Sequence, residues 1–263
     1  MGGKDLGKAI AIFNQKGGVG KTTTNVNLAT CLAIRGKKVL ILDIDPQGNT
    51  TSGIGIVKKG LEKTAYEVLI DDGMKPESAI MKTCIKNLDI IPASVKLAGA
   101  EIELVQLEGR EKRLKKAIES IKSKYDYIFI DCPPSLGLLT INSLTAVDSV
   151  LIPIQCEFYA LEGVSQLMST VELVQKNLNP DLKIQGVILS MFDGRTNLSI
   201  QVVEEVKKYF REKVYSTVIP RNVRLAEAPS HGLPITEYDP KSKGAEAYLE
   251  FADEFLELES EIK

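Results

Sequence analysis

Short runs of consecutive apolar residues alternate along the chain with longer segments in which apolar residues recur every three or four positions. The first run, residues 9–13, is uninterrupted, which is typical of a strand buried on both faces of a parallel sheet. Residues 25–35 instead carry Val26, Leu28 and Leu32 at helical spacing. The same two patterns predict further strands at 38–42, 88–91, 127–130, 150–154, 184–189 and 214–219, and further helices at 96–124, 161–177, 200–211 and 244–261.

This alternation predicts an α/β fold in which a mostly parallel, twisted sheet is flanked by helices on both faces, a three-layer sandwich. Ligands of such sheets bind outside the carboxyl ends of the strands. The 263 residues contain no segment with the composition of a linker, so we expect a single domain over residues 1–263.

Charge and hydropathy narrow the class of protein. The chain has 33 basic and 35 acidic residues, so any contact with nucleic acid must come from a local patch. No apolar run approaches the roughly 20 residues that span a bilayer, and residues 1–8 lack the apolar core of a signal peptide. We therefore expect a cytoplasmic protein with no membrane partner.

The four cysteines, Cys31, Cys84, Cys132 and Cys156, are far apart and form no C-x-x-C pair. This spacing suggests neither a zinc ribbon nor a disulfide framework. We interpret them as reduced packing residues.

A glycine-rich loop lies between the first strand and the first helix. It departs from the standard phosphate-loop pattern, because Gln15 stands where the first glycine is usual, and it carries an additional lysine, Lys16. Glycines in this position let backbone amides and a helix N-terminus surround phosphate oxygens. The predicted nucleotide-binding residues of the loop are Lys16, Gly17, Gly18, Val19, Gly20, Lys21, Thr22 and Thr23, with Lys21 on the β and γ phosphates and the Thr22 hydroxyl on magnesium.

Acidic residues end two of the predicted strands. Asp131 follows the strand at 127–130 as in a Walker B motif, where such an acid holds magnesium. Asp45 follows the second strand, and we predict that it orients or activates the attacking water. Thr22, Asp45 and Asp131 are the predicted magnesium residues; Asp43 is an alternative that the sequence leaves open.

Four segments, residues 16–24, 43–49, 159–163 and 218–230, resemble the ParA family of chromosome and plasmid partitioning ATPases, and most closely its short chromosomal members, the Soj type. The resemblance covers residues 9–251. It implies a deviant Walker A ATPase that forms a nucleotide-sandwich homodimer, in which Lys16 reaches the partner's phosphates. A lysine serving the other subunit would make ATP binding and dimerisation one event, so the predicted catalytic residues are Lys16, Lys21 and Asp45.

The resemblance also indicates which base the nucleotide carries and which macromolecules the protein contacts. Pro220 and Asn222 are expected to line the adenine pocket with Met191 nearby, and the absence of the Asn-Lys-x-Asp motif of GTPases favours ATP. A ParB-type centromere-binding protein is the expected partner, stimulating a slow hydrolysis of ATP. The implied localisation is the bacterial nucleoid.

Residues 193–224 form a local basic patch, with seven basic against four acidic residues in a chain of net charge −2. Arg195 and Arg224 resemble the DNA-binding arginines of Soj-like proteins, and Arg221 lies in the same patch. The helical lysines could equally form a solvated face. We expect non-specific, salt-sensitive binding of double-stranded DNA.

Three rival functions are less consistent with the residues. A MinD-like membrane-associated positioning ATPase is the main alternative, but it needs a basic C-terminal amphipathic helix, whereas residues 248–259 are amphipathic and acidic. An iron–sulfur carrier needs placed cysteines. A non-catalytic DNA-coating protein would not need Lys21, Thr22, Asp45 and Asp131. We interpret His231 as a turn residue rather than a catalyst or pH switch.

Overall fold

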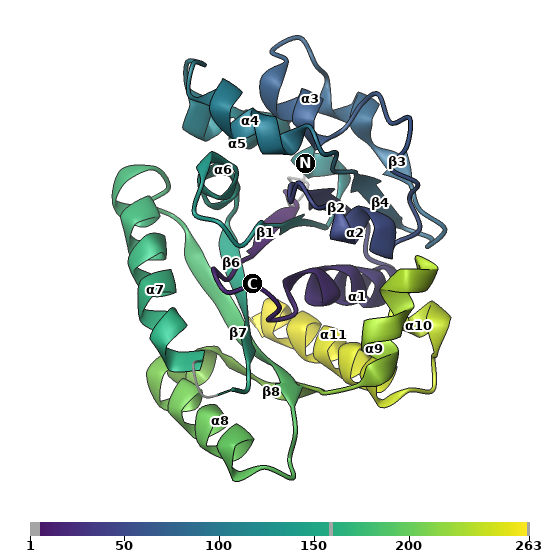
Figure 1. Ribbon diagram of the computed structural model, residues 1–263, viewed down its shortest axis with the longest axis vertical. Coiled ribbons are helices and arrows are strands. Elements are labelled where there is room, and N and C mark those ends of the chain that lie inside the picture. The colour runs from purple at the N-terminus through teal and green to yellow at the C-terminus, as the bar shows by residue number, and fades with distance from the viewer. Residues whose placement is uncertain (1–5, 158–159, 262–263) are drawn as a thin grey trace.

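A computed structural model describes residues 6–157 and 160–261 and shows an eight-stranded sheet with the strand order β3-β4-β2-β5-β1-β6-β7-β8 (Figure 1). All neighbouring pairs are parallel except β3 with β4. The strands are β1 (Lys8–Ile12), β2 (Val39–Asp43), β3 (Met81–Lys82), β4 (Leu88–Ile91), β5 (Tyr127–Asp131), β6 (Ser149–Gln155), β7 (Lys183–Phe192) and β8 (Val214–Pro220).

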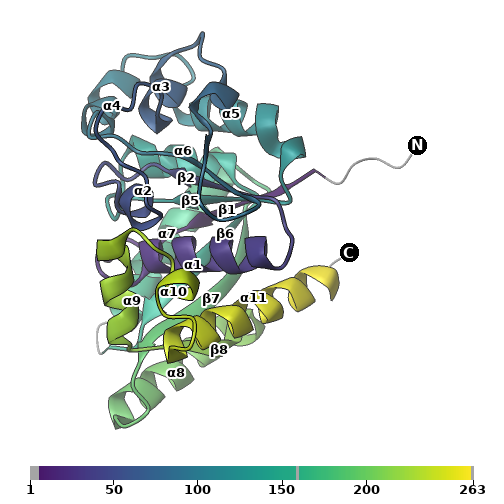
Figure 2. The same cartoon turned by 90° about the vertical axis from the view of Figure 1, so that its right-hand side faces the viewer.

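Helices cover both faces of this sheet. The helices are α1 (Lys21–Ile34), α2 (Asn49–Gly53), α3 (Ala65–Ile70), α4 (Leu97–Leu104), α5 (Arg113–Ile121), α6 (Leu138–Ala146), α7 (Ala160–Asn177), α8 (Asn197–Phe210), α9 (Val223–Glu227), α10 (Ile235–Tyr238) and α11 (Lys243–Glu261). Helices α1 and α11 lie side by side on one face, and the helices from α3 to α8 lie on the other (Figures 1 and 2). The predicted three-layer α/β fold is confirmed.

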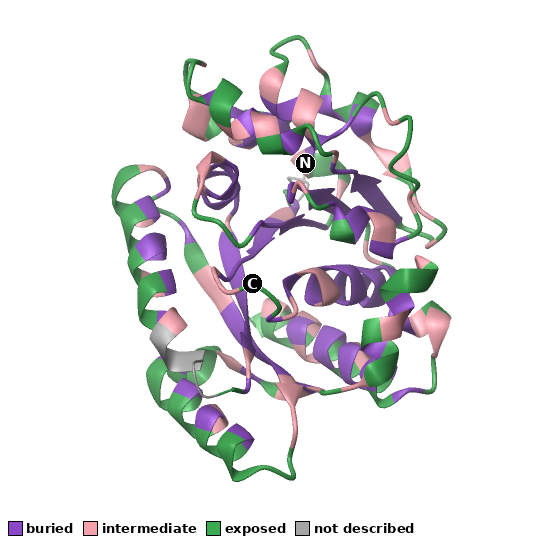
Figure 3. Cartoon of the chain, in the orientation of Figure 1, coloured by how far each residue is buried: buried purple, intermediate pink, exposed green. Residues whose placement is uncertain are grey.

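Alternate residues of the central strands face two separate cores. On β1, Ala9 and Ala11 pack with the helices of the α3–α8 face, whereas Ile10 and Ile12 pack with α1 and α11. Strands β1, β2 and β5 are buried almost throughout, which explains their uninterrupted apolar sequence (Figure 3).

The predicted strands are all present, with ends that move by at most three residues. The single helix predicted over 96–124 is wrong. The segment contains α4, a 3-10 turn at Arg110–Lys112, α5 and a second 3-10 turn at Lys122–Lys124. Gly109 adopts φ 61°, a left-handed conformation that interrupts a right-handed helix.

The cysteines agree with a fold that has no disulfide framework. Cys31, Cys132 and Cys156 are buried and Cys84 is exposed, and all four thiols are free. Among the described helices, none is both long enough and apolar enough to cross a membrane.

Candidate nucleotide site

The phosphate loop connects the carboxyl end of β1 to the first turn of α1. Gly18 and Gly20 have φ of 76° and 91°, which only glycine adopts without strain. Gly20 is the residue that precedes α1, and no side chain caps that helix end. A Cβ built on Gly17 or Gly18 would meet nothing within 4 Å. Uncapped amides beside open space are the features that bind a phosphate anion.

Neighbouring elements hold the loop from both sides. The Asn14 amide donates to the Pro153 carbonyl at 2.8 Å and accepts from the Lys16 amide at 3.0 Å. The Gln15 side chain donates to Thr170 Oγ1 of α7 at 2.7 Å. The residue that breaks the standard glycine pattern thus anchors the loop to a helix on the other side of the sheet.

The two lysines of the loop have different environments. Lys21 is 7% exposed, and its Nζ donates to the Lys16 carbonyl at 3.2 Å. Burial lowers the pKa of Lys21, and the charge of Asp131 opposes that shift. The Lys16 side chain is 38% exposed, with its Nζ 3.9 Å from Glu157 Oε2, so it is not committed to a close ion pair.

Two buried carboxylates lie side by side below the loop, because β2 pairs with β5 and brings Asp43 opposite Asp131. Asp131 Oδ2 accepts hydrogen bonds from Thr22 Oγ1 at 2.8 Å and Thr50 Oγ1 at 2.7 Å. Asp131 Oδ1 is buried and has no hydrogen-bond partner within the described chain. Asp43 Oδ2 accepts from both the backbone amide and the hydroxyl of Thr51, at 2.8 and 2.6 Å.

Burial raises the pKa of both carboxyl groups, and the charge of Asp131 raises the pKa of Asp43 further. Two adjacent buried acids with an oxygen left unbonded fit a nearby cation. Within the described residues, no three Asp, Glu, His or Cys side chains are grouped to hold a metal by themselves. This donor set fits magnesium, which takes one or two protein ligands and completes its shell with phosphates and water.

Asp45 lies past the end of β2 and is 8% exposed. Its Oδ1 accepts from the Gln47 amide at 2.9 Å, and its Oδ2 accepts no hydrogen bond from the described residues. Asp43, by contrast, receives the Asp45 amide on Oδ1 at 3.2 Å and has both oxygens bonded. Asp45 is therefore the member of this pair with a free oxygen, while Asp43 is tied to the protein.

Thr50 and Thr51 were not identified from the sequence. Both are fully buried, and they are the second and third residues of α2, which follows Gly48 with its φ of 61°. The only signal in the sequence is their place one turn after the second strand. Their hydroxyls connect α2 to the two buried carboxylates.

A mostly apolar cavity of about 360 Å³ opens beside the loop, between β7, β8 and α9. Its volume suits a small-molecule ligand. Met191, which has φ 52°, and Asn222, whose Oδ1 accepts the Arg224 amide at 2.8 Å, both line it. The cavity brings together the three predicted adenine-pocket residues and two residues of the loop region: Met191, Pro220, Asn222, Gly20 and Thr23.

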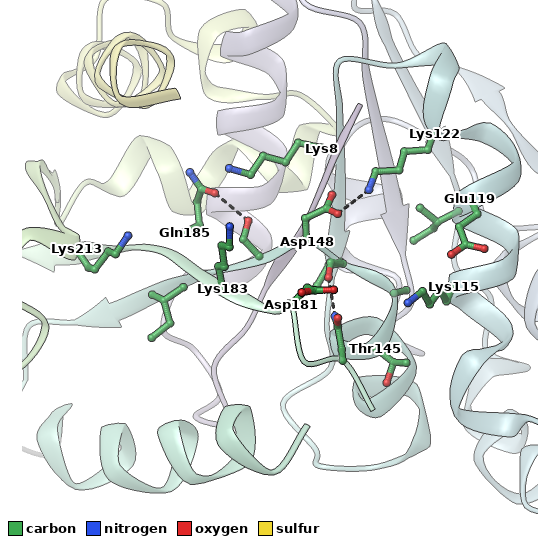
Figure 4. Close-up of a pocket in the computed structure, with 16 residues that line it drawn as sticks. Lys8, Lys115, Glu119, Lys122, Thr145, Asp148, Asp181, Lys183, Gln185 and Lys213 are labelled. Atoms are coloured by element: carbon green, nitrogen blue, oxygen red, sulfur yellow. Dashed lines mark hydrogen bonds and ion pairs between the residues drawn. The ribbon is translucent and has the colours of Figure 1, made fainter. Parts of the chain in front are cut away.

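A larger cavity of about 540 Å³ lies at the opposite edge of the sheet, near the amino ends of β1, β6 and β7 (Figure 4). Lysines and carboxylates both line it. Asp148 uses one oxygen on Lys122 at 2.6 Å and the other on the Ala9 amide at 2.7 Å. This cavity has mixed charge and no glycine loop beside it, so it lacks the features of the carboxyl edge that bind a phosphate anion.

The three predicted DNA-binding arginines are exposed and lie on the β7–β8 side of the carboxyl edge. Arg195 follows β7 and forms a two-pronged ion pair with Asp193 at 2.8 and 2.7 Å. Arg221 follows β8 and lines the 360 Å³ cavity. Arg224 pairs with Glu227 at 2.9 Å and lies 3.4 Å from Asp239. The resemblance segment 159–163 falls partly outside the described residues.

Comparison with known proteins places this geometry in a family. A family described as an AAA domain matches residues 7–184. The Soj protein of Bacillus subtilis, called a sporulation initiation inhibitor, is 67% identical over 95% of this chain and 98% of its own. The chromosome partitioning protein ParA of Myxococcus xanthus is 52% identical over 97% and 90%.

A solved structure of a Mycobacterium smegmatis protein called cobyrinic acid a,c-diamide synthase, with bound ADP and magnesium, superposes with a TM-score of 0.82. That protein is 40% identical, and the match covers 94% of this chain and 93% of the other. Together with the identity to Soj and ParA over nearly the whole length, the glycine loop and paired carboxylates show that this chain belongs to the Soj/ParA family of chromosome partitioning proteins.

Proposed function

We propose that the protein is a partitioning ATPase that hydrolyses ATP to ADP and phosphate, with magnesium as cofactor. ATP joins two copies of the chain, the dimer binds double-stranded DNA non-specifically, and a ParB-type partner stimulates hydrolysis and release. The observation that carries the proposal is the uncapped end of α1 beside an unbonded, buried oxygen of Asp131.

The residues of the loop would bind and orient the triphosphate. The α1 amides face the phosphates, Lys21 contacts the β and γ oxygens, and Thr22 and Asp131 hold magnesium directly or through water. Magnesium supplies charge neutralisation at the phosphates when bound. The free Oδ2 of Asp45 orients the attacking water and accepts its proton.

Lys16 accounts for the link between nucleotide and dimer. Its side chain is partly exposed and its nearest acid is at the limit of an ion pair, so it can reach a second subunit at little cost. A cation that contacts the partner's phosphates stabilises the dimer only while ATP is bound. Loss of the γ phosphate then weakens the dimer.

The arginines of the β7–β8 side would contact DNA phosphates. Arg195 is 88% exposed and Arg224 is 54% exposed, so their surface ion pairs can exchange for phosphate contacts. No helix of the described residues carries an evident base-reading pattern, and contacts to phosphate alone give no sequence preference. The acidic surface of α11 disfavours the MinD-like alternative, because anionic lipid would repel it.

The decisive experiment measures DNA binding with ATP, with ADP and without nucleotide across a salt series. We expect tight DNA binding only when ATP is present. The slope of the logarithm of the binding constant against the logarithm of the salt concentration should fall in magnitude by about one to two in Arg224→Glu. Lys112→Glu has the same charge change at an exposed position of the opposite sheet face and should match the wild type. DNA binding that is independent of nucleotide would refute the proposed function.

A further inference from the structure

Helix α2 lies between the magnesium site and the segment that carries Arg224. It packs against the 3-10 turn at Ala228–His231 that follows α9. Both views show it at the carboxyl edge of the sheet, near α9 (Figures 1 and 2). We refer to residues 222–232, which comprise the cap residue Asn222, α9, a 3-10 turn at Ala228–His231 and Gly232, as the arginine segment.

The first end of α2 is bonded to the carboxylates. Thr50 Oγ1 donates to the same oxygen of Asp131 that accepts from Thr22, at 2.7 Å. Thr51 donates twice to Asp43 and accepts the Ala93 amide at 2.9 Å. Both hydroxyls are fully buried, so water cannot replace these bonds, and α2 must respond to any rearrangement of the two acids.

Just past the other end of α2, the backbone of Gly55 approaches the backbone of Gly232 in the arginine segment. A Cβ built on Gly55 would lie 2.9 Å from the Gly232 carbonyl oxygen, and one built on Gly232 would lie 2.9 Å from Gly55 Cα. Both glycines are in the left-handed region, with φ of 85° and 65°. The two backbones thus leave no room for a side chain between them. Because packed interiors transmit displacement, a movement of one is passed to the other.

Apolar contacts add to this junction. Ile54 is 1% exposed and belongs to the same buried cluster as Leu225 and Ala228 of the arginine segment. Within the segment, α9 runs into the 3-10 turn without a break, so a continuous helical stretch joins Arg224 to Gly232, the residue that ends the turn. A shift at Gly232 therefore changes the position of Arg224.

We propose that α2 transmits the state of the magnesium–phosphate site to the arginine segment, with Thr50 as the positioning residue at one end and the Gly55–Gly232 contact at the other. This rests on the proposed function, because it assumes that Arg224 contacts DNA. Loading the site rearranges Asp131 and Thr50, α2 moves with them, and the arginine segment takes its DNA-binding position. By reciprocity, DNA raises the affinity for ATP by the same factor.

The test is the ratio of DNA affinity with ATP to DNA affinity with ADP, each at saturating nucleotide. In the wild type we expect a ratio on the order of 10 or more. Gly55→Ala should bring the ratio close to one, while the affinity for a fluorescent ATP analogue stays at the wild-type value. Gly60→Ala is the matched control, since Gly60 has φ 82° and its Cβ would meet nothing within 4 Å.

Thr50→Val tests the other end of α2 and does not depend on Gly55→Ala folding. It keeps the shape of the side chain and removes the bond to Asp131, so it should also lower the ratio, whereas Thr50→Ser should restore it. A wild-type ratio in folded Gly55→Ala or in Thr50→Val overturns the proposal, and so does an equal fall in Gly60→Ala. A wild type that shows no preference for ATP would instead refute the proposed function itself.

Discussion

The two edges of the sheet both carry lysines and aspartates, but these side chains differ in how fully they are hydrogen-bonded and ion-paired. At the amino edge, Asp148 has both oxygens bonded, to Lys122 and to the Ala9 amide, and Lys8 is paired with Glu259 at 2.7 Å. At the carboxyl edge, Asp131 keeps a buried oxygen without a partner. Both edges have a cavity with an unbonded buried oxygen beside it. At the larger cavity that oxygen is the neutral hydroxyl of Thr145, whereas at the carboxyl edge it belongs to the carboxylate of Asp131.

We infer from this difference that a buried carboxylate with an unbonded oxygen indicates a ligand better than cavity size does. Paired charges at the amino edge are already stabilised and gain little from a ligand. At the carboxyl edge, burial without full bonding raises the free energy of the empty site, and that energy is recovered on binding.

The largest effect is expected for Asp45→Ala. Loss of the group that activates water should reduce ATP turnover by about 10²–10⁴-fold while ATP still binds, so the ATP-bound dimer accumulates. Steady-state phosphate release and size-exclusion chromatography would measure both quantities. Asp148→Asn, at the amino edge, should leave turnover at the wild-type rate; normal turnover in Asp45→Ala would remove Asp45 from the mechanism.

Lys16→Ala should weaken the ATP-dependent dimer by roughly 100-fold, because a buried phosphate loses a charged partner. Nucleotide binding by the single chain should persist, since Lys21 remains. Sedimentation with ATP gives the dimer affinity, and Lys8→Ala is the amino-edge control. Dimerisation of Lys16→Ala at the wild-type concentration would exclude a role across the subunits.

The smallest effect concerns stability without metal. Burial raises the pKa of Asp131 to about 6, so the charged form destabilises the fold. The folded state is therefore most stable, with respect to this group, when the carboxyl is protonated. This contribution is fully present below about pH 4 and is lost as the pH rises through about 6. In EDTA, Asp131→Asn should therefore gain roughly 3 kcal/mol near pH 7 and nothing near pH 4.

Urea unfolding at the two pH values measures this gain. Asp148→Asn should change stability little at either pH, because its amide oxygen can still accept from the Ala9 backbone. Asp148→Ala leaves that buried amide unbonded and should cost about 1–3 kcal/mol. A loss of stability in Asp131→Asn near pH 7 would contradict the assignment of this carboxylate as a destabilised group.

The sequence predicts the strands well because strands such as β1 and β5 are buried on both faces and have no polar residue to interrupt them. It fails for α6, which is buried around most of its circumference and so lacks an amphipathic pattern. Asn142 of this helix is of a residue type that favours turns, yet its side-chain oxygen accepts a hydrogen bond from the Leu114 amide at 3.2 Å. Tertiary hydrogen bonds of this kind have no local signal.

The candidate site likewise contains residues that the sequence identifies and residues that it misses. The loop, Asp43, Asp45 and Asp131 were predicted because their types and their places at strand ends are visible in the sequence. Thr50 was missed because its importance depends on β2 and β5 being neighbours, which brings α2 against Asp131. Which of Asp43 and Asp45 is tied to the protein was likewise decided by Thr51, a residue with no motif of its own.

The exposed thiol of Cys84 has a practical consequence. It lies in the turn before β4, at the amino edge, and the other three cysteines are buried. A maleimide dye should therefore label the unmodified protein at one position, away from the phosphates. If two chains meet through their carboxyl edges, the two dyes would sit at opposite ends of the dimer, and energy transfer would distinguish that arrangement from a dimer joined through its amino edges.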